Sequence, residues 1–498
     1  MHALPKEDGS LVHFVPMRAV NEEFGGIDVT ARRLFGEVKK GYTAFQEGDA
    51  LFAKITPCME NGKLALVPKL DDGIGFGSTE FHVVRARTDV SQKWLAYFLS
   101  QAEFRKFARR HMTGTAGQLR VATPWLAATR LPLAPTQEQT RIVDKLEELL
   151  SDLDAGVAEL KAAQKKLAQY RQSLLKAAVE GRLTETWRAQ HGNTSASEES
   201  GAQLLTRILR ERRARWETKQ LAKFEAQGKT PLKGWQTKYP EPVSPDPMAL
   251  GELPDGWAWA SLDQCSLDDA AITDGPFGSN LKSAHYTTKG ARVIRLQNIG
   301  DGIFLDAVAH ISESHFASLQ KHSVLAGDII IAMLGEVLPR ACVVPEGIAP
   351  AIVKADCARV RANVGLISPT LLGFFLGSDP TRKRVTGLVK GIGRPRVNLG
   401  SLRGIPIPIP SRDEQMQIES TLDAHAFSMG EQLGAIELGL KKSAAQRKNI
   451  LQAAFSGQLV PQDPNDEPAS VLLARIRAER AVRETSGTRS RLKKKAVA

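Results

Sequence analysis

Residues 174–183 read L-L-K-A-A-V-E-G-R-L, and residues 450–459, which lie 276 positions later, read I-L-Q-A-A-F-S-G-Q-L. The same offset holds over residues 117–183, where it pairs Gly117 with Gly393 and Arg120 with Arg396. Two copies of one unit within a single polypeptide predict a pseudo-dimer. A pseudo-dimer with two-fold symmetry is suited to reading a site on DNA that has two parts.

Each copy is predicted to contain one long helix, because no proline occurs between residues 136 and 180 or between residues 411 and 456. A hydroxyl residue followed three positions later by a carboxylate or amide predicts a capping box at each start, namely Thr136 with Gln139 and Ser411 with Glu414. Gly181 and Gly457 stand where a left-handed residue would end each helix. We therefore expect two helices of about 44 residues, each about 66 Å long.

Both predicted helices carry a heptad pattern of apolar residues. In the first helix the pattern is unbroken and consists of Ile142, Leu146, Leu149, Leu153, Gly156, Leu160, Ala163, Leu167, Tyr170, Leu174 and Ala177. In the second helix it consists of Ile418, Leu422, Ala426, Met429, Leu433, Ile436, Leu440 and Ile450, with an interruption at Ser443 and Arg447. So narrow and long a stripe predicts that the two helices pack on each other, with a globular region at either end. The alternative is that each helix packs on its own domain.

The globular regions combine short β-branched runs bounded by glycine and aspartate with helical stretches. This pattern predicts an α+β fold, with two tandem globular domains separated by two long antiparallel helices that form a coiled coil. The expected boundaries are a first domain at 1–134, a first long helix at 135–184, a linker with a charged helix at 185–250, a second domain at 251–410, a second long helix at 411–460, and a charged helix with a basic tail at 461–498.

The composition indicates an ordinary globular protein with a polyanionic partner. Lys and Arg outnumber Asp and Glu by 67 to 55, which gives a net charge of +12 and favours nucleic acid or an anionic surface. The four cysteines show no C-x-x-C spacing, which argues against a disulfide framework and against a zinc site. No apolar run has the length of a signal peptide or of a membrane span, so we expect a cytoplasmic protein.

The motifs of common enzymes are absent from the sequence. There is no G-x-x-x-x-G-K-[ST] phosphate loop, no H-E-x-x-H zinc motif and no strand-bounded G-x-G-x-x-G. We therefore expect no catalytic centre, no metal site and no bound cofactor in this chain. The lack of these motifs argues against the hypothesis that the chain is a self-sufficient nuclease or methyltransferase.

Polar, basic and glycine-rich segments recur in both halves, and their side chains suit contacts with phosphates and base edges. The candidate DNA-binding residues of the first half are Lys54, Thr56, Asn61, Lys63, Ser78, Thr79 and Arg120. Those of the second half are Ser279, Asn280, Lys282, Arg292, Arg295, Gln297, Asn298, Arg394 and Arg396.

With these features together, the chain resembles the specificity subunits of type I restriction-modification systems. The resemblance rests on the tandem plan, on L-P-D-G-W at 253–257, on D-G-P-F-G-S at 274–279, on I-T-P-C-M-E-N-G-K at 55–63, and on the twin helices that end A-A-V-E-G-R-L and A-A-F-S-G-Q-L. It covers essentially the whole chain.

The resemblance implies a non-catalytic reader of double-stranded DNA. Domains 1–134 and 251–410 would be target recognition domains for the two halves of an asymmetric, interrupted sequence, and the paired helices would fix the gap and dock two methylation subunits. Those partners would bring S-adenosylmethionine, and restriction subunits would bring ATP, Mg and cleavage. A coiled-coil scaffold that binds only proteins is the alternative.

The first domain departs from the family pattern at its start. The globular regions align at an offset of 279, and at that offset the counterpart of the L-P-D-G-W motif at 253–257 would fall before residue 1. The first domain is therefore expected to lack its opening strand and its D-G-P-F-G-S counterpart, through a truncation or a late start, which weakens the prediction of its DNA contacts.

Overall fold

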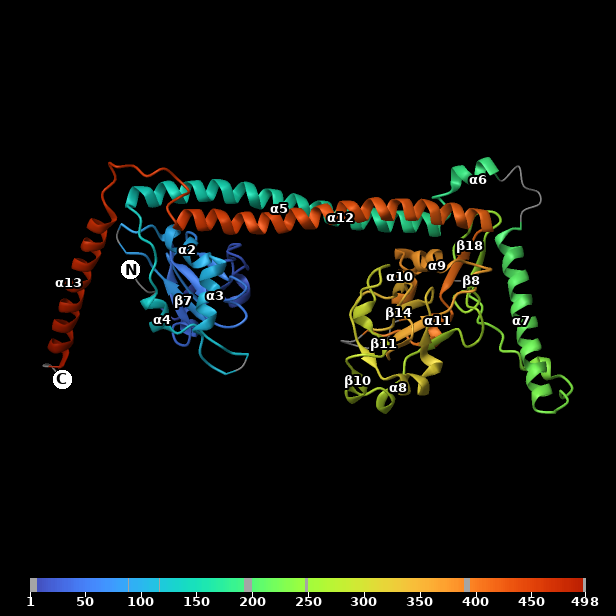
Figure 1. Ribbon diagram of the computed structural model, residues 1–498. Coiled ribbons are helices and arrows are strands. Elements are labelled where there is room, and N and C mark those ends of the chain that lie inside the picture. Colours follow the sequence, from blue (N-terminus) through green and yellow to red (C-terminus); the bar gives the residue numbers. More distant parts are fainter. Residues whose placement is uncertain are drawn as a thin grey trace. The chain divides into compact units, whose positions relative to one another are not determined.

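The computed structural model describes residues 7–87, 89–115, 117–191, 199–246, 250–388 and 395–495. The chain forms two compact units (Figure 1). Unit 1 contains Met1–Ala162 and Ala435–Ala498, and unit 2 contains Ala163–Gly434. Each unit combines one β-rich domain with parts of two long helices, which confirms the predicted α+β class. No helix within the described ranges is both long and apolar enough to cross a membrane.

The domain of unit 1 is built on two small sheets. The first has the order β2 (Arg32–Leu34), β1 (Leu11–Val15), β6 (Ile74–Gly77), β3 (Thr43–Gln46), and the second has the order β5 (Leu64–Leu66), β4 (Ala50–Ala53), β7 (Phe81–Val84). Only the pair of β1 with β6 is parallel among the strand pairs that the structure describes here. The helices of this domain are α1 (Phe35–Val38), α2 (Gln92–Ser100), α3 (Ala102–Arg110) and α4 (Thr123–Ala128).

The domain of unit 2 has three sheets. The first sheet has the order β10 (Tyr286–Thr287), β12 (His310–Ile311), β11 (Ala291–Ile294), β16 (Ala351–Val353), β13 (Ser323–Val324). The second has the order β15 (Arg340–Val343), β14 (Ile329–Ala332), β17 (Cys357–Val360), β9 (Ile272–Asp274). The third pairs β18 (Pro406–Ile409) with β8 (Ala258–Ser261). Its helices are α8 (Glu313–Ser318), α9 (Pro369–Leu376), α10 (Asp379–Thr386) and α11 (Leu399–Arg403).

The two long helices are α5 (Thr136–Val179) and α12 (Arg412–Phe455), each of 44 residues. In unit 1 the start of α5 packs on the end of α12 through a cluster that contains Ile142, Leu146, Ile450, Leu451 and Ala454. In unit 2 the end of α5 and the start of α12 share a core that contains Leu175, Ala178, Ile418 and Leu422. The helices therefore pack together and run antiparallel, as the heptad pattern predicted.

The helix seam is more polar than the apolar pattern suggested. Ser443 and Arg447, where the apolar pattern breaks, are half-buried in it, and the guanidinium of Arg447 pairs with Asp154. Leu160 lies over Gly439, where an added Cβ would come within 3.1 Å of its Cδ1. Three predicted seam positions, Gly156, Tyr170 and Ala426, are exposed. A paired helix covers only a narrow strip. The two small residues fall outside it, and the ring of Tyr170 lies at its border, 5.9 Å from the ring of His425.

The predicted helix ends are confirmed at the carboxyl side and corrected at the amino side. Gly181 and Gly457 have φ values of +70° and +74°, in the left-handed region that favours glycine. The capping box predicted for Thr136 and Gln139 is wrong, because Gln139 is fully buried and its amide bonds Ser91 N and Ala134 O. Ser411 Oγ accepts from Glu414 N at 3.4 Å, but the Glu414 carboxylate binds elsewhere.

Three further helices follow the two long ones, namely α6 (Glu185–His191) and α7 (Gly201–Ala226) after α5, and α13 (Ala469–Lys495) after α12. Helix α7 packs on β8 and β18, where Leu204 and Ile208 are buried in the core of unit 2. Its Arg212 is buried and donates to Asp263 O at 2.5 Å. The backbone of residues 489–495, predicted as a basic tail, continues α13 as helix.

Candidate nucleic-acid interface

One ion pair recurs at the same place in both domains. Arg120 donates through Nε and Nη2 to the Glu80 carboxylate at 2.8–3.1 Å, and Arg396 Nη1 lies 2.8 Å from Asp356 Oδ1. Both members of each pair are related by the offset of 276. The hydrogen bonds from Arg120 hold the pKa of Glu80 below its usual value. The sequence repeat identified the arginines, whereas their carboxylate partners were not predicted.

The backbone around each pair is also the same. Lys54 N donates to Glu80 O and Met333 N donates to Asp356 O, each at 2.9 Å. Lys54 follows strand β4, and Met333 follows strand β14, both of which are fully buried. Each arginine is therefore anchored at the end of a buried strand while its side chain stays about 40% exposed, at 39% and 41%.

A second repeated ion pair, missed in the sequence, lies at the other end of these strands. Arg85 binds Asp49 through two hydrogen bonds, and Arg361 binds Asp328 in the same way. Both aspartates are buried and follow the glycine that precedes each strand. The recurring Gly-Asp before a buried run was the available signal. These pairs hold the strands and belong to the scaffold of the interface.

Three candidates of the first domain use their polar groups within the fold. Thr56 Oγ1 donates to Gly117 O and accepts from Leu119 N, both at 3.1 Å. Lys63 Nζ donates to Val20 O at 2.7 Å, and Asn61 Nδ2 donates to Glu22 Oε1 at 2.8 Å. The Thr56 contacts hold the loop that leads to Arg120, and the Lys63 and Asn61 contacts hold residues 55–63 against residues 20–22.

Other candidates of the first domain lie beside the Arg120 and Glu80 pair. Ser78 Oγ accepts from Glu80 N at 3.2 Å, and Thr79 is exposed between them. Lys54 is half-buried, and its charge helps to lower the pKa of Glu80. The structure thus brings Lys54, Ser78, Thr79 and Arg120 together around one carboxylate.

In the second domain the D-G-P-F-G-S segment lies beside Arg396. The Arg396 guanidinium lies over the ring of Phe277, 5.5 Å from its centroid, and that ring is 47% exposed. Gly275 is packed against backbone, since an added Cβ would come within 2.1 Å of Lys354 C. Ser279, Asn280 and Lys282 follow as exposed residues. This group combines a cation, an exposed aromatic ring and polar side chains, which are the chemistry of a nucleic-acid contact.

The R-V-I-R-L-Q-N segment divides into structural and exposed residues. Asn298 is only 1% exposed, and its amide bonds Arg295 N, Leu305 O and Ala307 O at 2.8–2.9 Å. The predicted base contact of Asn298 therefore needs correction, because its Oδ1 accepts from the preceding Arg295 N and its Nδ2 donates to the following Leu305 O and Ala307 O. Arg292 is paired with Asp306, and Arg295 Nη2 donates to Val308 O at 3.3 Å. Gln297 is exposed.

One predicted residue, Arg394, lies outside the described residues. Lys354 was not predicted, although its Nζ lies 5.9 Å from the ring centroid of Tyr286 near the D-G-P-F-G-S segment. It stands 72 residues after Lys282, so the sequence offered no local signal for it.

Three of the four cysteines are buried. All four cysteines are free thiols, and burial raises the pKa of Cys342 and of Cys357 to about 12. Over the residues that the structure describes, no group of three or more His, Cys, Asp or Glu side chains could hold a metal ion.

Comparison with known proteins gives one consistent result. The chain is 28% identical over 448 residues to the specificity subunit of the type I restriction enzyme EcoAI from Escherichia coli, which covers 84% of this chain and 74% of that protein. It is 26% identical over 467 residues to the EcoEI specificity subunit of the same species, with the same two coverages. No protein-family model matches the chain.

The fold has a counterpart among solved structures. A chain from a study of complex assembly and conformational transition of the type I R-M system superposes with a TM-score of 0.56. The superposition covers 92% of this chain and 96% of that chain at 18% sequence identity, which is a likeness of fold.

Proposed function

Because the chain belongs to the family of type I restriction enzyme specificity subunits, we propose that it reads a bipartite, asymmetric DNA sequence and docks methylation subunits. It is a non-catalytic component of such an enzyme. Each of its two domains is proposed to read one half of the target. The members of the family differ in the bases they read, so the fold itself gives no target sequence.

The observation that carries this proposal is the pair of matched arginines, Arg120 and Arg396. Each forms a β-bridge with a residue just after a buried strand, is paired with a carboxylate, and remains partly exposed. Arginine is the side chain that most often reads guanine, through two hydrogen bonds in the major groove. Arg396 uses Nη1 for the ion pair with Asp356, so its other N–H groups can donate to DNA. Arg120 donates to both Glu80 and Gln118 O, so more of its N–H groups are used within the protein. Of the two arginines, Arg396 is therefore the stronger candidate for a base contact.

The residues around the two arginines differ, which supports two unlike half-sites. Arg396 has the ring of Phe277 and exposed Ser279, Asn280 and Lys282 nearby. Arg120 has Ser78 and Thr79. Different side chains at equivalent positions would select different bases, which makes the whole target asymmetric.

The long helices are proposed to set the gap between the half-sites and to dock the methylation subunits. A pair of packed helices is stiff, so its length would fix a distance. The methylation subunits would supply S-adenosylmethionine, and restriction subunits would supply ATP and Mg²⁺. Reading cellular DNA would place the complex in the cytoplasm.

The test is a binding titration of the chain with a methylation subunit against random duplexes, followed by methylation mapping in cells that carry both genes. We expect one interrupted sequence to be enriched, with an affinity that falls steeply with salt. A coiled-coil scaffold that binds only proteins would give neither sequence preference nor a steep salt dependence, and that outcome would overturn the proposal.

A further inference from the structure

The residue that follows the parallel-paired strand differs between the two domains. Ser78 follows β6, and its backbone N donates to Val15 O at 3.1 Å. Lys354 follows β16, and its backbone N donates to Ile294 O at 2.8 Å. Each lies two positions before the carboxylate residue of the repeated ion pair, and the offset of 276 relates the two. The two positions are therefore equivalent, with a hydroxyl in the first domain and a cation in the second.

The ammonium group of Lys354 is not neutralised within the fold. The residue is half-buried, and no ion pair or side-chain hydrogen bond joins it to any described residue. By contrast, Arg292 of the same domain is paired with Asp306. Lys354 Nζ lies 5.9 Å from the ring centroid of Tyr286, whose hydroxyl is buried and has no partner in the described structure. Lys354 thus keeps three N–H donors for a ligand, while the ring restricts where they lie.

A second cation of this domain is also incompletely paired inside the protein. Arg340 begins β15, and Lys63, which directly precedes β5, holds the same place in the first domain. Lys63 Nζ donates to Val20 O at 2.7 Å. Arg340 Nη2 donates to Leu296 O at the longer distance of 3.4 Å, and its Nε is buried without a partner among the residues described. The second domain therefore has more unused donors near this strand than the first.

Arg340 and Lys354 lie around the same thiol. Burial and the charge of Asp356 raise the pKa of Cys357 to about 12, whereas the charges of Arg340 and Lys354 act in the opposite direction. Arg396 binds the same aspartate. Three cations thus accompany one carboxylate in this region, and the excess of positive charge favours a ligand that is anionic or rich in acceptors.

The D-G-P-F-G-S segment joins Lys354 to the Arg396 site. Its Gly275 packs on the backbone of Lys354, where an added Cβ would come within 2.1 Å of the carbonyl carbon. Its Phe277, two residues further along, lies against the Arg396 guanidinium. One segment therefore contacts both Lys354 and Arg396, and each of these cations has an aromatic ring beside it.

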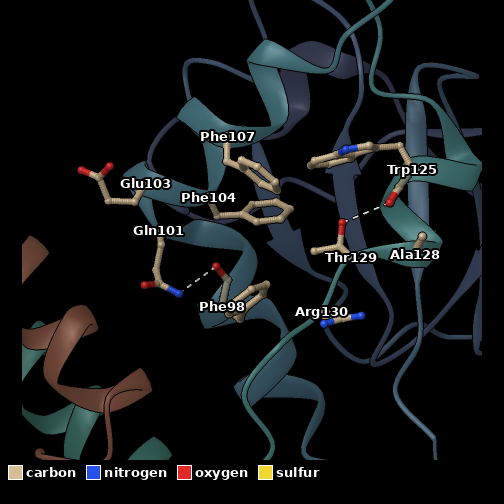
Figure 2. A pocket seen from close by; sticks show the side chains of 9 residues that line it. All are labelled: Phe98, Gln101, Glu103, Phe104, Phe107, Trp125, Ala128, Thr129 and Arg130. Atoms are coloured by element: carbon tan, nitrogen blue, oxygen red, sulfur yellow. Dashed lines mark hydrogen bonds between the residues drawn. The ribbon is translucent and has the colours of Figure 1, made fainter.

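The first domain places its aromatic rings elsewhere. Figure 2 shows its pocket of about 500 Å³, which is lined by the rings of Phe98, Phe104, Phe107 and Trp125. None of the nine residues drawn there is a predicted DNA contact. Within the described part of this domain, no ring makes a cation–π contact with Lys54 or Arg120. The surroundings of the repeated ion pair thus differ between the domains in charge and in aromatic content.

A difference at equivalent positions is what direct reading of bases requires. Contacts with phosphates carry no sequence information, so two domains that bind the same backbone can share them. Base contacts have to differ wherever the half-sites differ. Lysine pairs with the O6 and N7 acceptors of guanine, whereas serine bonds to several bases. Because Ser78 and Lys354 differ while the ion pair beside them is kept, the position fits a base contact.

From these contacts we infer that Lys354 is a specificity-determining residue of the second domain and reads a guanine in the same half-site as Arg396. Its counterpart Ser78 leaves the equivalent position of the first half-site open to other bases. The inference rests on the proposed function and assigns to it one further residue and one base.

Selection from random duplexes, with the full chain and a methylation subunit, tests this role. The unaltered chain is expected to enrich guanine at one position of the half-site that Arg396→Ala alters. Lys354→Met removes the charge at similar length, and Lys354→Ser installs the residue of the first domain. Both are expected to lower the preference for that guanine by about tenfold. Lys354→Arg should retain it, because arginine also pairs with guanine.

The controls separate base reading from folding and from charge. Thermal unfolding of each variant should match that of the unaltered chain, because the Lys354 side chain makes no hydrogen bond or ion pair with a described residue. Lys383→Met changes an exposed lysine of α10 in the same unit and measures the effect of losing one positive charge alone. Preferences in the other half-site should be the same for all of these variants.

Three results would overturn the inference. They are an unchanged guanine preference in Lys354→Met, a loss of affinity that is equal on every sequence and no larger than that of Lys383→Met, and a lost preference in the half-site that Arg120→Ala alters. Each of these leaves the proposed function intact. If the unaltered chain enriches no sequence at all, the proposed function fails, and the role of Lys354 fails with it.

Discussion

The indole of Trp257 and the carboxylate of Glu414 form a buried hydrogen bond of 2.8 Å across 157 positions of sequence. Glu414 is 3% exposed and lies in the first turn of α12, where a carboxylate also interacts favourably with the helix dipole. Thr184 Oγ1 donates to the same carboxylate at 2.6 Å. This one side chain of α12 thus contacts both the start of the second domain and the segment that follows α5.

Trp257→Phe is therefore expected to destabilise unit 2. The substitution keeps most of the apolar surface but leaves a buried carboxylate oxygen without its donor, for which a loss of about 1–3 kcal/mol is typical. Urea unfolding followed by circular dichroism measures the change. Trp259→Phe is the matched control, since that indole donates to Gly251 O near the surface. If both variants lose the same free energy of unfolding, the hydrogen bond from Trp257 to Glu414 does not contribute to stability.

Arg396→Ala is expected to weaken recognition of one half-site only. A guanine contact by arginine contributes about 1–3 kcal/mol of discrimination, so the loss should appear on the cognate sequence and vanish on DNA altered in that half. Arg120→Ala tests the other half in the same assay. If Arg396→Ala lowers affinity for every sequence and reduces the salt slope by about one, the residue contacts phosphate alone.

Asn298→Ala is expected to change stability more than specificity. Its amide makes three hydrogen bonds that hold residues 295–307, and removing them from a buried position typically costs about 1–3 kcal/mol. Thermal unfolding measures this effect. Gln297→Ala, at the exposed neighbouring position, should leave the melting temperature unchanged. If the Asn298→Ala variant is as stable as the unaltered chain but recognises different bases, Asn298 contacts a base directly.

Removing one heptad from both long helices is expected to shorten the gap between half-sites. Deletion of residues 156–162 with residues 437–443 keeps the pair of Asp154 with Arg447 and removes facing segments, as the contact of Leu160 with Gly439 shows. Each helix becomes about 10 Å shorter, which equals about three base pairs. Methylation mapping should report the new gap with the same bases. Altered bases, or methylation at the original gap, would contradict the spacer role.

Tyr97 predicts a loss of stability at alkaline pH. Burial, helped by the nearby charges of Glu147 and Asp154, raises its pKa from 10.0 to about 12. Since the folded state favours the neutral phenol, this contribution is complete below pH 10 and disappears as the pH rises to about 12. Urea unfolding at pH 8 and pH 11.5 should show a smaller alkaline loss for Tyr97→Phe than for the unaltered chain. Tyr42→Phe, at an exposed tyrosine, controls for the substitution.

The candidate interface was predictable only where the repeat reached it. The offset of 276 identified Arg120 and Arg396 as equivalent, and the structure places each beside a carboxylate, Glu80 or Asp356, that immediately precedes a strand. The roles of Thr56, Lys63 and Asn298 were not predictable, because a polar residue in a glycine-rich loop looks the same whether it faces solvent or bonds backbone. The partners of Thr56 and Lys63, such as Gly117 O and Val20 O, lie tens of residues away. Those of Asn298 lie three to nine residues away, in a loop whose path the sequence does not specify.

The sequence by itself determined the two 44-residue helices, their glycine ends and their antiparallel pairing. Those properties follow from local rules, namely a 3.6-residue period, the absence of proline and the freedom of glycine at positive φ. Only the tertiary structure decided that Gln139 binds Ser91, that Asn298 is buried, and that Glu414 binds Trp257. Each of these depends on which distant segment packs nearby, and spacing along the chain does not encode that contact.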